Sequence, residues 1–265
     1  MTTAARPTTE QGSHFYSVNG EPLYEVAKKD GSGMRPFTLA DARKMDPMPL
    51  PSVTTILSIL RKPALETWLI ENAVLAAMTT PRPPEEPLDA FIERVLHTER
   101  VQDQESDIAK KRGIEIHDAI EGYFAHGGPP DEIMEWIAPV VGFLEDQGEV
   151  LGSEQILVSE DGYAGRTDLI QTIGAGVLIW DFKTTKKLPK TAYNDHVLQL
   201  SAYANAFPKP PISPDFKLAT GNIYISTVEP GKYVVCEHES FWGDTYEMGF
   251  KPLLKHWQWA NNYHP

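Results

Sequence analysis

The sequence contains only one cysteine, Cys236, among its 265 residues. A single cysteine excludes a framework of disulfides within the chain and agrees with a reducing compartment. No apolar run approaches the length of about 20 residues that a membrane-spanning helix needs. The first 12 residues are polar and lack the apolar segment of a secretory signal. We therefore expect a cytoplasmic protein that has no membrane partner.

Positive charge is also scarce. The chain has 24 Lys and Arg residues against 37 Asp and Glu residues, which gives a net charge of −13. Long-range attraction to a polyanion is weak or repulsive at this charge, and this argues against a nonspecific DNA coat. A protein of this charge can still act on nucleic acid if its basic residues are concentrated and a divalent cation sits in its cleft. The length allows one domain with a sizeable core and appendages.

A predicted hairpin places two acidic residues near each other. The apolar run over residues 178–183 ends in alternation and predicts a strand. Residues 163–172 predict a second strand, and the glycine-rich turn over residues 173–176 joins the two. This hairpin brings Asp168 and Asp181 side by side when the register is right, whereas a slip of one residue moves Asp168 to the far face.

The strand over residues 178–183 carries a carboxylate and a lysine on one face. Because side chains alternate along a strand, Asp181 and Lys183 share a face, while Trp180 and Phe182 point toward the core. Two neighbouring carboxylates repel unless a positive charge lies between them. One interpretation is an exposed strand edge at which Lys183 pairs with Asp181 at the surface. The other is a cation-binding site at the rim of a buried sheet.

A histidine lies on a predicted helix upstream of both strands. The helix over residues 102–124 places Lys110, Gly113, His117 and Glu121 on one face, at spacings of three and four. One interpretation is a partly buried histidine that is satisfied by Glu121. The other is metal ligation, since imidazole is a competent ligand beside carboxylates and Glu121 would then hold its tautomer. Gly113 would let another segment approach the helix closely.

Five short motifs follow one another along the chain. They are Pro51–Leu57, Gly113–His117, Gly165-x-x-Asp168, Asp181-x-Lys183 and Gln199-x-x-x-Tyr203. The pattern resembles the PD-(D/E)XK nucleases, specifically the RecB-like exonuclease branch, and it is similar to the mitochondrial genome maintenance exonucleases and to phage exonucleases. The resemblance covers about residues 51–207. Thr167 stands where the name of the superfamily has proline, and without a cysteine cluster the resemblance implies no iron–sulfur cluster.

The order of the elements predicts an α+β fold, with a mixed central β-sheet flanked by helices. The resemblance adds a restriction-endonuclease-like core with a helical N-terminal part. We expect residues 1–50 to form an extension with a disordered start and a hairpin at Asn19-Gly20. Residues 51–265 then form the nuclease domain, whose helical N-terminal part is a wall of the substrate channel. Other predicted helices cover residues 52–60, 63–78, 131–147 and 194–207, and other predicted strands cover residues 154–159, 218–227 and 233–239.

The resemblance implies a metal site built from the motif residues. It assigns Mg²⁺ or Mn²⁺ to His117, Asp168, Asp181 and the backbone carbonyl of Phe182. These oxygen-rich ligands suit hard cations, and Mg²⁺ usually keeps several of its waters.

The resemblance also implies roles in catalysis and substrate binding. Besides the two aspartates, Lys183 is expected to orient the attacking water or to offset transition-state charge, while Gln199 and Tyr203 position the phosphate or the lysine. For the basic residues, phosphate contact and a solvated face remain alternatives. Two interpretations are open for Glu154, a carboxylate that touches the site at the end of its strand and a surface carboxylate, and we expect the second. The predicted substrate-binding residues are Arg166, Thr184, Lys110, Lys111, Arg112, Lys186 and Lys187.

The resemblance implies a metal-dependent DNA exonuclease that hydrolyses phosphodiester bonds of single-stranded or resected ends, in replication, recombination or repair. Two alternatives stay open, a structure-specific or flap endonuclease and a nuclease-fold DNA-binding module without catalysis. DNA is the expected partner, and the sequence leaves open a homo-oligomer and a partner protein of recombination or replication. If a phage encodes the chain, the expected compartment is the host cytoplasm.

Overall fold

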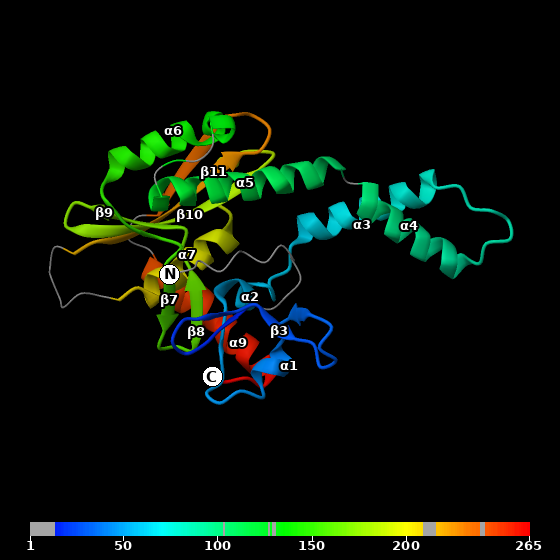
Figure 1. The fold of residues 1–265 in the computed structure, drawn as a ribbon, viewed down its shortest axis with the longest axis horizontal. Coiled ribbons are helices and arrows are strands. Elements are labelled where there is room, and N and C mark those ends of the chain that lie inside the picture. The colour runs from blue at the N-terminus through cyan, green and yellow to red at the C-terminus, as the bar shows by residue number, and fades with distance from the viewer. Residues whose placement is uncertain (1–13, 103, 127, 129–130, 209–215, 239–241) are drawn as a thin grey trace.

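The computed structural model describes residues 14–102, 104–126, 128, 131–208, 216–238 and 242–265. The disordered start predicted for the N-terminus lies outside these ranges. Within the described part of the chain, no helix combines the length and the apolar character that crossing a membrane requires. The protein is α+β, with a mixed central sheet and flanking helices (Figure 1).

The central sheet has five strands in the order β12-β11-β10-β9-β6. Its longest strand, β10 (Gly176–Thr185), runs antiparallel to β9 (Leu169–Ile173) and parallel to β11 (Leu218–Ser226). Antiparallel pairing adds β12 (Tyr233–His238) at one edge and β6 (Val150–Ser153) at the other. The predicted hairpins β9–β10 and β11–β12 are therefore confirmed.

Helices cover both faces of this sheet. Parallel strands need a crossover between them, and α7 (Asn194–Ala206) is that crossover from β10 to β11. It packs on one face, whereas α5 (Gln104–His126) and α6 (Asp131–Gln147) pack on the other (Figure 1). Because side chains alternate along β10, the strand contributes to two cores. Val177 and Ile179 face α7, and the α5–α6 side receives Leu178, Trp180 and Phe182.

The N-terminal segment packs against the C-terminal helix. Strand β1 (Phe15–Tyr16) pairs with β2 (Pro22–Leu23) and with β5 (Leu50–Pro51), which confirms the predicted hairpin around Asn19-Gly20. The ring of Phe15 lies 6.5 Å from that of Trp257 on α9 (Lys251–Asn261). Residues 14–50 thus share a core with the rest of the chain, and the domain boundary at residue 51 stays a prediction. The short elements β3 (Glu25–Ala27), β4 (Met34–Pro36) and α1 (Leu39–Ala42) complete this segment.

Two helices project from the body of the molecule. Pro63 opens α3 (Pro63–Thr79), as predicted, and a loop connects it to α4 (Leu88–Gln102), which packs against it (Figure 1). Large apolar side chains on α3 face solvent, including Trp68 at 47% exposure and Met78 at 80%. The predicted helix start at Ser52 is also confirmed, because its hydroxyl accepts a hydrogen bond from the Thr55 amide in α2 (Val53–Leu57).

The strand predicted over residues 163–172 is two strands. Residues Tyr163–Arg166 form β8, which pairs with β7 (Ile156–Ser159) in a separate two-stranded sheet. The chain then crosses to the central sheet and continues as β9. At the break, the amide of Thr167 still donates to the carbonyl of Gln155, its partner in the β7–β8 register, at 2.9 Å. The short helix α8 (Trp242–Thr245) and the π-helix over Tyr246–Phe250 were not predicted.

Candidate active site

The candidate site lies where β9 and β10 separate. Their pairing ends at Leu169 opposite Trp180. At the next step the carboxylate of Asp168 accepts a hydrogen bond from the Phe182 amide, at 2.5 Å from Oδ2. A side chain therefore takes the position of a backbone ladder bond, and β10 continues beyond β9 with β11 as its neighbour. This separation opens the sheet beside the second half of β10.

The backbone of Phe182 faces the same opening. In an antiparallel ladder, one residue presents its N–H and its C=O to the same neighbouring strand. Because the Phe182 amide meets Asp168, the Phe182 carbonyl is directed to that side too. The Phe182 carbonyl oxygen, which is predicted as a metal ligand, is thus on the side of β10 that faces Asp168.

Asp181 and Lys183 form a close ion pair on the α7 face of β10. Lys183 Nζ lies 2.9 Å from Oδ1 and 2.7 Å from Oδ2 of Asp181. Asp181 is only 2% exposed, so the interpretation as an exposed surface pair is wrong. Burial raises the pKa of the Asp181 carboxyl to about 6, against the opposing effect of the Lys183 ammonium, and Asp168 adds to the rise. A carboxylate in this setting gains from any further positive charge beside it.

His117 reaches the site from α5. Its Nδ1 lies 4.0 Å from Asp168 Oδ2, and its ring centroid is 6.1 Å from that of Phe182. The helix comes this close because residue 113 is glycine, since a Cβ there would meet the Thr184 hydroxyl at 2.6 Å. The sequence predicts that another backbone or the nucleic acid approaches Gly113, whereas the group that lies there is the Thr184 side chain. His117 is thereby brought beside a carboxylate from a distant segment.

Gln199 and Tyr203 form a pair on α7. Gln199 Nε2 donates to the Tyr203 hydroxyl at 2.7 Å, as the spacing of four residues predicts. Burial raises the pKa of Tyr203, and the charge of Asp181 acts in the same direction, so the phenol is neutral at neutral pH. Gly165 on β8 makes room for this ring, because a Cβ there would lie 2.4 Å from Tyr203 Cε1.

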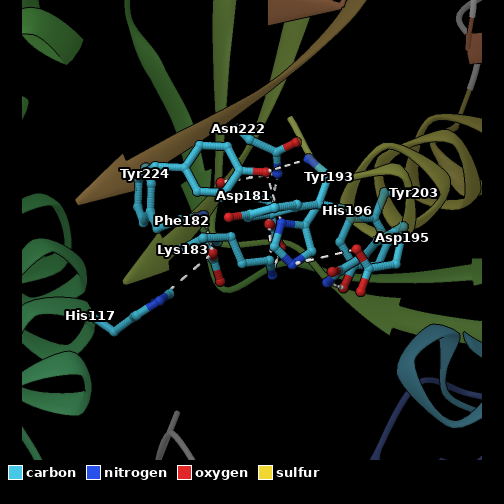
Figure 2. Close-up of polar contacts among 12 residues, drawn as sticks. His117, Asp181, Phe182, Lys183, Tyr193, Asp195, His196, Tyr203, Asn222 and Tyr224 are labelled. Atoms are coloured by element: carbon cyan, nitrogen blue, oxygen red, sulfur yellow. Dashed lines mark hydrogen bonds and ion pairs between the residues drawn. The ribbon is translucent and has the colours of Figure 1, made fainter. Parts of the chain in front are cut away.

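These side chains line one cavity. It has a volume of about 400 Å³, and every residue predicted to bind metal or to act in catalysis lines it. Figure 2 shows the side chains that converge there from β10, α5 and α7. Two predicted substrate-binding residues, Arg166 and Thr184, also line the cavity. The predicted residues in its wall are His117, Arg166, Asp168, Asp181, Phe182, Lys183, Thr184, Gln199 and Tyr203.

The remaining basic residues predicted to bind substrate are not in the cavity wall. On α5, Arg112 lies over the Trp136 ring at 4.3 Å and pairs with Glu115 at 3.3 Å. Lys110 and Lys111 lie on the same helix as Arg112. Lys186 and Lys187 are exposed and directly follow the end of β10. Their predicted contacts with phosphate stay predictions.

The interpretation of Glu154 as a surface carboxylate is wrong. Its side chain is 9% exposed, and Oε2 lies 2.6 Å from Nε of Arg166. The error arises because β8 folds back onto this part of the chain, and the amide of Glu154 donates to the carbonyl of Asp168. Glu154 therefore neutralises the arginine of the cavity wall.

Asn222 is a site residue that the motifs did not identify. It is fully buried on β11, opposite Asp181 in the parallel register, and its Nδ2 donates to Asp181 Oδ2 at 3.0 Å (Figure 2). Its Oδ1 lies 3.1 Å from His238 Nε2, which must be the donor because an amide oxygen only accepts. The signal in the sequence is a carboxamide inside a strand whose other polar side chains are all hydroxyls.

The same face of β11 carries Tyr224, which extends the polar network. Its hydroxyl lies 2.8 Å from His196 Nδ1 and accepts a hydrogen bond from the Tyr193 amide at 3.1 Å. Burial lowers the pKa of His196 to about 4, and the charge of Lys183 acts in the same direction. At neutral pH this imidazole is therefore uncharged beside the lysine.

The donor set fits a hard divalent cation in its chemistry. Two carboxylates, an imidazole and a backbone carbonyl are ligand types that Mg²⁺ and Mn²⁺ accept, and they lie around one cavity. In the described part of the chain, no three His, Cys, Asp or Glu side chains are already grouped closely enough to hold a metal ion. The placement of such an ion is therefore part of the proposal below.

Comparisons with known proteins assign no family to this chain. No family model matches it, and no curated protein matches it. Among solved structures, the protein SSO0001 gives a TM-score of 0.28 at 13% identity, over 57% of this chain and 75% of the other. A likeness of this size supports no statement about fold or function.

Proposed function

We propose that this chain is a Mg²⁺- or Mn²⁺-dependent DNA exonuclease of the PD-(D/E)XK type. The observation that carries the proposal is the meeting of Asp168, Asp181 and Lys183 around one cavity, with His117 from a distant helix. These are the residues that the resemblance to RecB-like exonucleases singles out. The resemblance depends on the order of motifs in the sequence, and the convergence of these residues in space supports it independently.

In this proposal the metal ligands are His117, Asp168, Asp181 and the carbonyl of Phe182. A divalent cation held by these residues would supply Lewis-acid chemistry, by activating water and by offsetting negative charge on the scissile phosphate. The buried carboxylate of Asp181 is suited to this role, because its pKa is raised by burial even with Lys183 beside it. A further positive charge would therefore stabilise its ionised form.

Lys183 supplies the second positive charge. Its ammonium is held by the Asp181 carboxylate and faces the cavity, so it is already oriented when substrate arrives. A fixed charge directed at developing negative charge contributes several kcal/mol to many enzymatic rates, roughly 3 kcal/mol for a single donor. Gln199 and Tyr203 present neutral hydrogen-bonding groups to the same space, where they position the phosphate.

The part-buried ion pair of Asp181 and Lys183 also argues for catalysis over simple binding. Burying a carboxylate and an ammonium together is often no more stabilising than apolar side chains of similar volume. A DNA-binding module has no use for such a pair in the wall of a cavity. An enzyme needs it, because the lysine and the acidic residue act on the same phosphate. This supports an active nuclease over the non-catalytic alternative.

The test is a cleavage assay with end-labelled single-stranded DNA and Mg²⁺. We expect release of nucleotides from linear strands and none from circular strands, because an exonuclease needs an end. Lys183→Ala should lower the rate by about a hundredfold or more. Lys232→Ala is the matched control, because this lysine is 60% exposed in a surface pair with Glu229.

Three results would contradict parts of this proposal. An unchanged rate in a folded Lys183→Ala variant would remove Lys183 from the mechanism, and cleavage of circular strands would indicate the endonuclease. Binding of DNA with Ca²⁺, without cleavage in Mg²⁺ or Mn²⁺, would favour the binding module. A thermal melt of each variant shows whether the fold is retained.

A further inference from the structure

The cavity has a second wall that the proposed chemistry does not use. This wall comes from the N-terminal segment and consists of His14, Tyr16 and Tyr24, next to Arg166 of β8. An octahedral cation held by four protein ligands keeps about two waters of about 30 Å³ each, so it would fill well under half of the 400 Å³ cavity. The total volume lies in the range of about 300–1,000 Å³ that is usual for small-molecule sites. There is room for a larger group beside the acidic residues.

Two aromatic rings of this wall contact each other. The rings of His14 and Tyr24 pack edge to face, with centroids 5.5 Å apart and an interplanar angle of 68°. Both side chains are half-buried, so they lie at the surface of the cavity and not in the core. An edge-to-face pair leaves a face of at least one ring free of the other ring. A flat ligand can lie against such a face.

The segment that carries His14 is held firmly to α2. Its amide donates to the Thr55 hydroxyl at 2.8 Å, and this hydroxyl is 3.2 Å from the His14 carbonyl. The amide of Ser52 donates to the same carbonyl at 2.8 Å. These bonds order the segment before any ligand arrives, which lowers the entropic cost of binding.

The charge of the wall selects the kind of ligand. Burial lowers the pKa of His14, and the positive charge of Arg166 acts in the same direction, so the imidazole is neutral at neutral pH. Arg166 is itself compensated by Glu154 at 2.6 Å. The wall therefore offers neutral rings and little net positive charge. A heterocyclic base suits it better than a phosphate does.

We propose that His14 and Tyr24 form a nucleobase subsite for the nucleotide next to the scissile phosphate. The proposal rests on the proposed function and specifies its substrate. A base inside a duplex has both faces covered by its neighbours, so only an unpaired base can stack on these rings. The subsite thus selects single-stranded DNA, or an end whose last nucleotide is unpaired.

The test measures binding of short single-stranded oligonucleotides to the full chain, with Ca²⁺ in place of Mg²⁺. One abasic residue is moved through the oligonucleotide, one position at a time. We expect the parent protein to lose about tenfold in affinity at one position, because stacking of one base on an aromatic ring has that effect. Tyr24→Leu should weaken binding of the intact oligonucleotide to a similar extent and abolish the abasic penalty. Tyr24→Phe should retain both.

Matched controls separate stacking from a change in the fold. Trp259→Leu removes an aromatic ring that is 74% exposed on α9, and it should leave the abasic penalty unchanged. If Tyr24→Leu fails to fold, as judged by circular dichroism, His14→Leu takes its place in the same comparison. The measurement on the parent protein needs no variant at all.

The outcomes distinguish this proposal from the proposed function. Equal affinity of the parent for intact and abasic strands at every position overturns the subsite, and so does a penalty that persists in Tyr24→Leu. Cleavage in Mg²⁺ without an abasic penalty overturns only the subsite. An abasic penalty without cleavage supports the subsite and contradicts the nuclease.

Discussion

The two faces of β10 differ although they come from the same ten residues. On the α5–α6 face, Leu178, Trp180 and Phe182 are buried among apolar side chains, and only Thr184 at the end of the strand is half-buried. On the α7 face, Ile179 is in a core, but Asp181 and Lys183 follow it at the cavity. Successive residues of β10 thus lie alternately in an apolar core and at the polar cavity. Alternation lets the chain carry charged groups at the rim of the sheet without placing them in the apolar core.

Polar groups occur on both faces, but their environments differ. On the α5–α6 face the indole of Trp180 donates to Gln171 at 2.8 Å, and Gln171 in turn donates to the Leu144 carbonyl at 2.8 Å. These groups are buried and fully enclosed. On the α7 face, Asp181 and Lys183 bond to each other and still line a cavity. One face therefore carries enclosed polar groups, and the other carries charged groups that line the cavity.

The largest expected effect comes from the apolar face. Trp180→Ala should lower the free energy of unfolding by about 3–5 kcal/mol, because it opens a cavity and leaves Gln171 without its donor. Urea denaturation monitored by circular dichroism measures this change. Met78→Ala is the control, since Met78 is 80% exposed and should change stability by less than about 0.5 kcal/mol. Similar values for the two variants would mean that this face is not the main core.

The next effect concerns the α7 face. Asn222→Leu keeps the volume but removes the hydrogen bond to Asp181, and hydrogen bonds to charged groups contribute about 1.5–3 kcal/mol. We expect the cleavage rate at saturating Mg²⁺ to fall by about tenfold or more. Asn205→Leu is the matched control, since Asn205 bonds to Tyr163 on the same side of the sheet and away from the cavity wall. Equal rates in both variants would show that Asn222 does not position Asp181.

The smallest expected effect concerns His117, which comes from the α5–α6 side of the sheet but lines the cavity. His117 reaches the site from the helix that covers the apolar face, so its loss tests whether this face contributes to metal binding. We expect His117→Ala to raise the Mg²⁺ concentration for half-maximal cleavage by about tenfold. His256→Ala removes an exposed histidine of α9 as a control. The same metal dependence in His117→Ala and in the parent would assign His117 a structural role.

Elements with strong local signals could be predicted from the sequence. Pro63 begins α3 because its ring already has the helical φ angle, and Ser52 caps α2 with its hydroxyl. The glycine-rich turn before Gly176 gives the hairpin of β9 and β10. In each case the interactions lie within a few residues of one another, so a short stretch of sequence contains them.

Features that depend on distant contacts were predicted poorly or not at all. At the break after β8, Thr167 still bonds to Gln155 beside β7, whereas Asp168 bonds to the Phe182 amide on the central sheet. Neither partner can be deduced from the residues around the break. The same holds for Tyr24 in the wall of the cavity, because the N-terminal segment reaches the cavity through its pairing with β5 and its bonds to α2.

The sequence by itself determined which side chains share a face, and it thereby identified Asp181 and Lys183 as a pair. This follows from the alternation of a strand, which is a property of the local backbone. Only the tertiary structure decided that Asn222 holds that pair and that His117 and Asp168 meet beside it. Those neighbours come from other strands and helices. Their positions depend on register and packing between segments far apart in the chain, which no local pattern encodes.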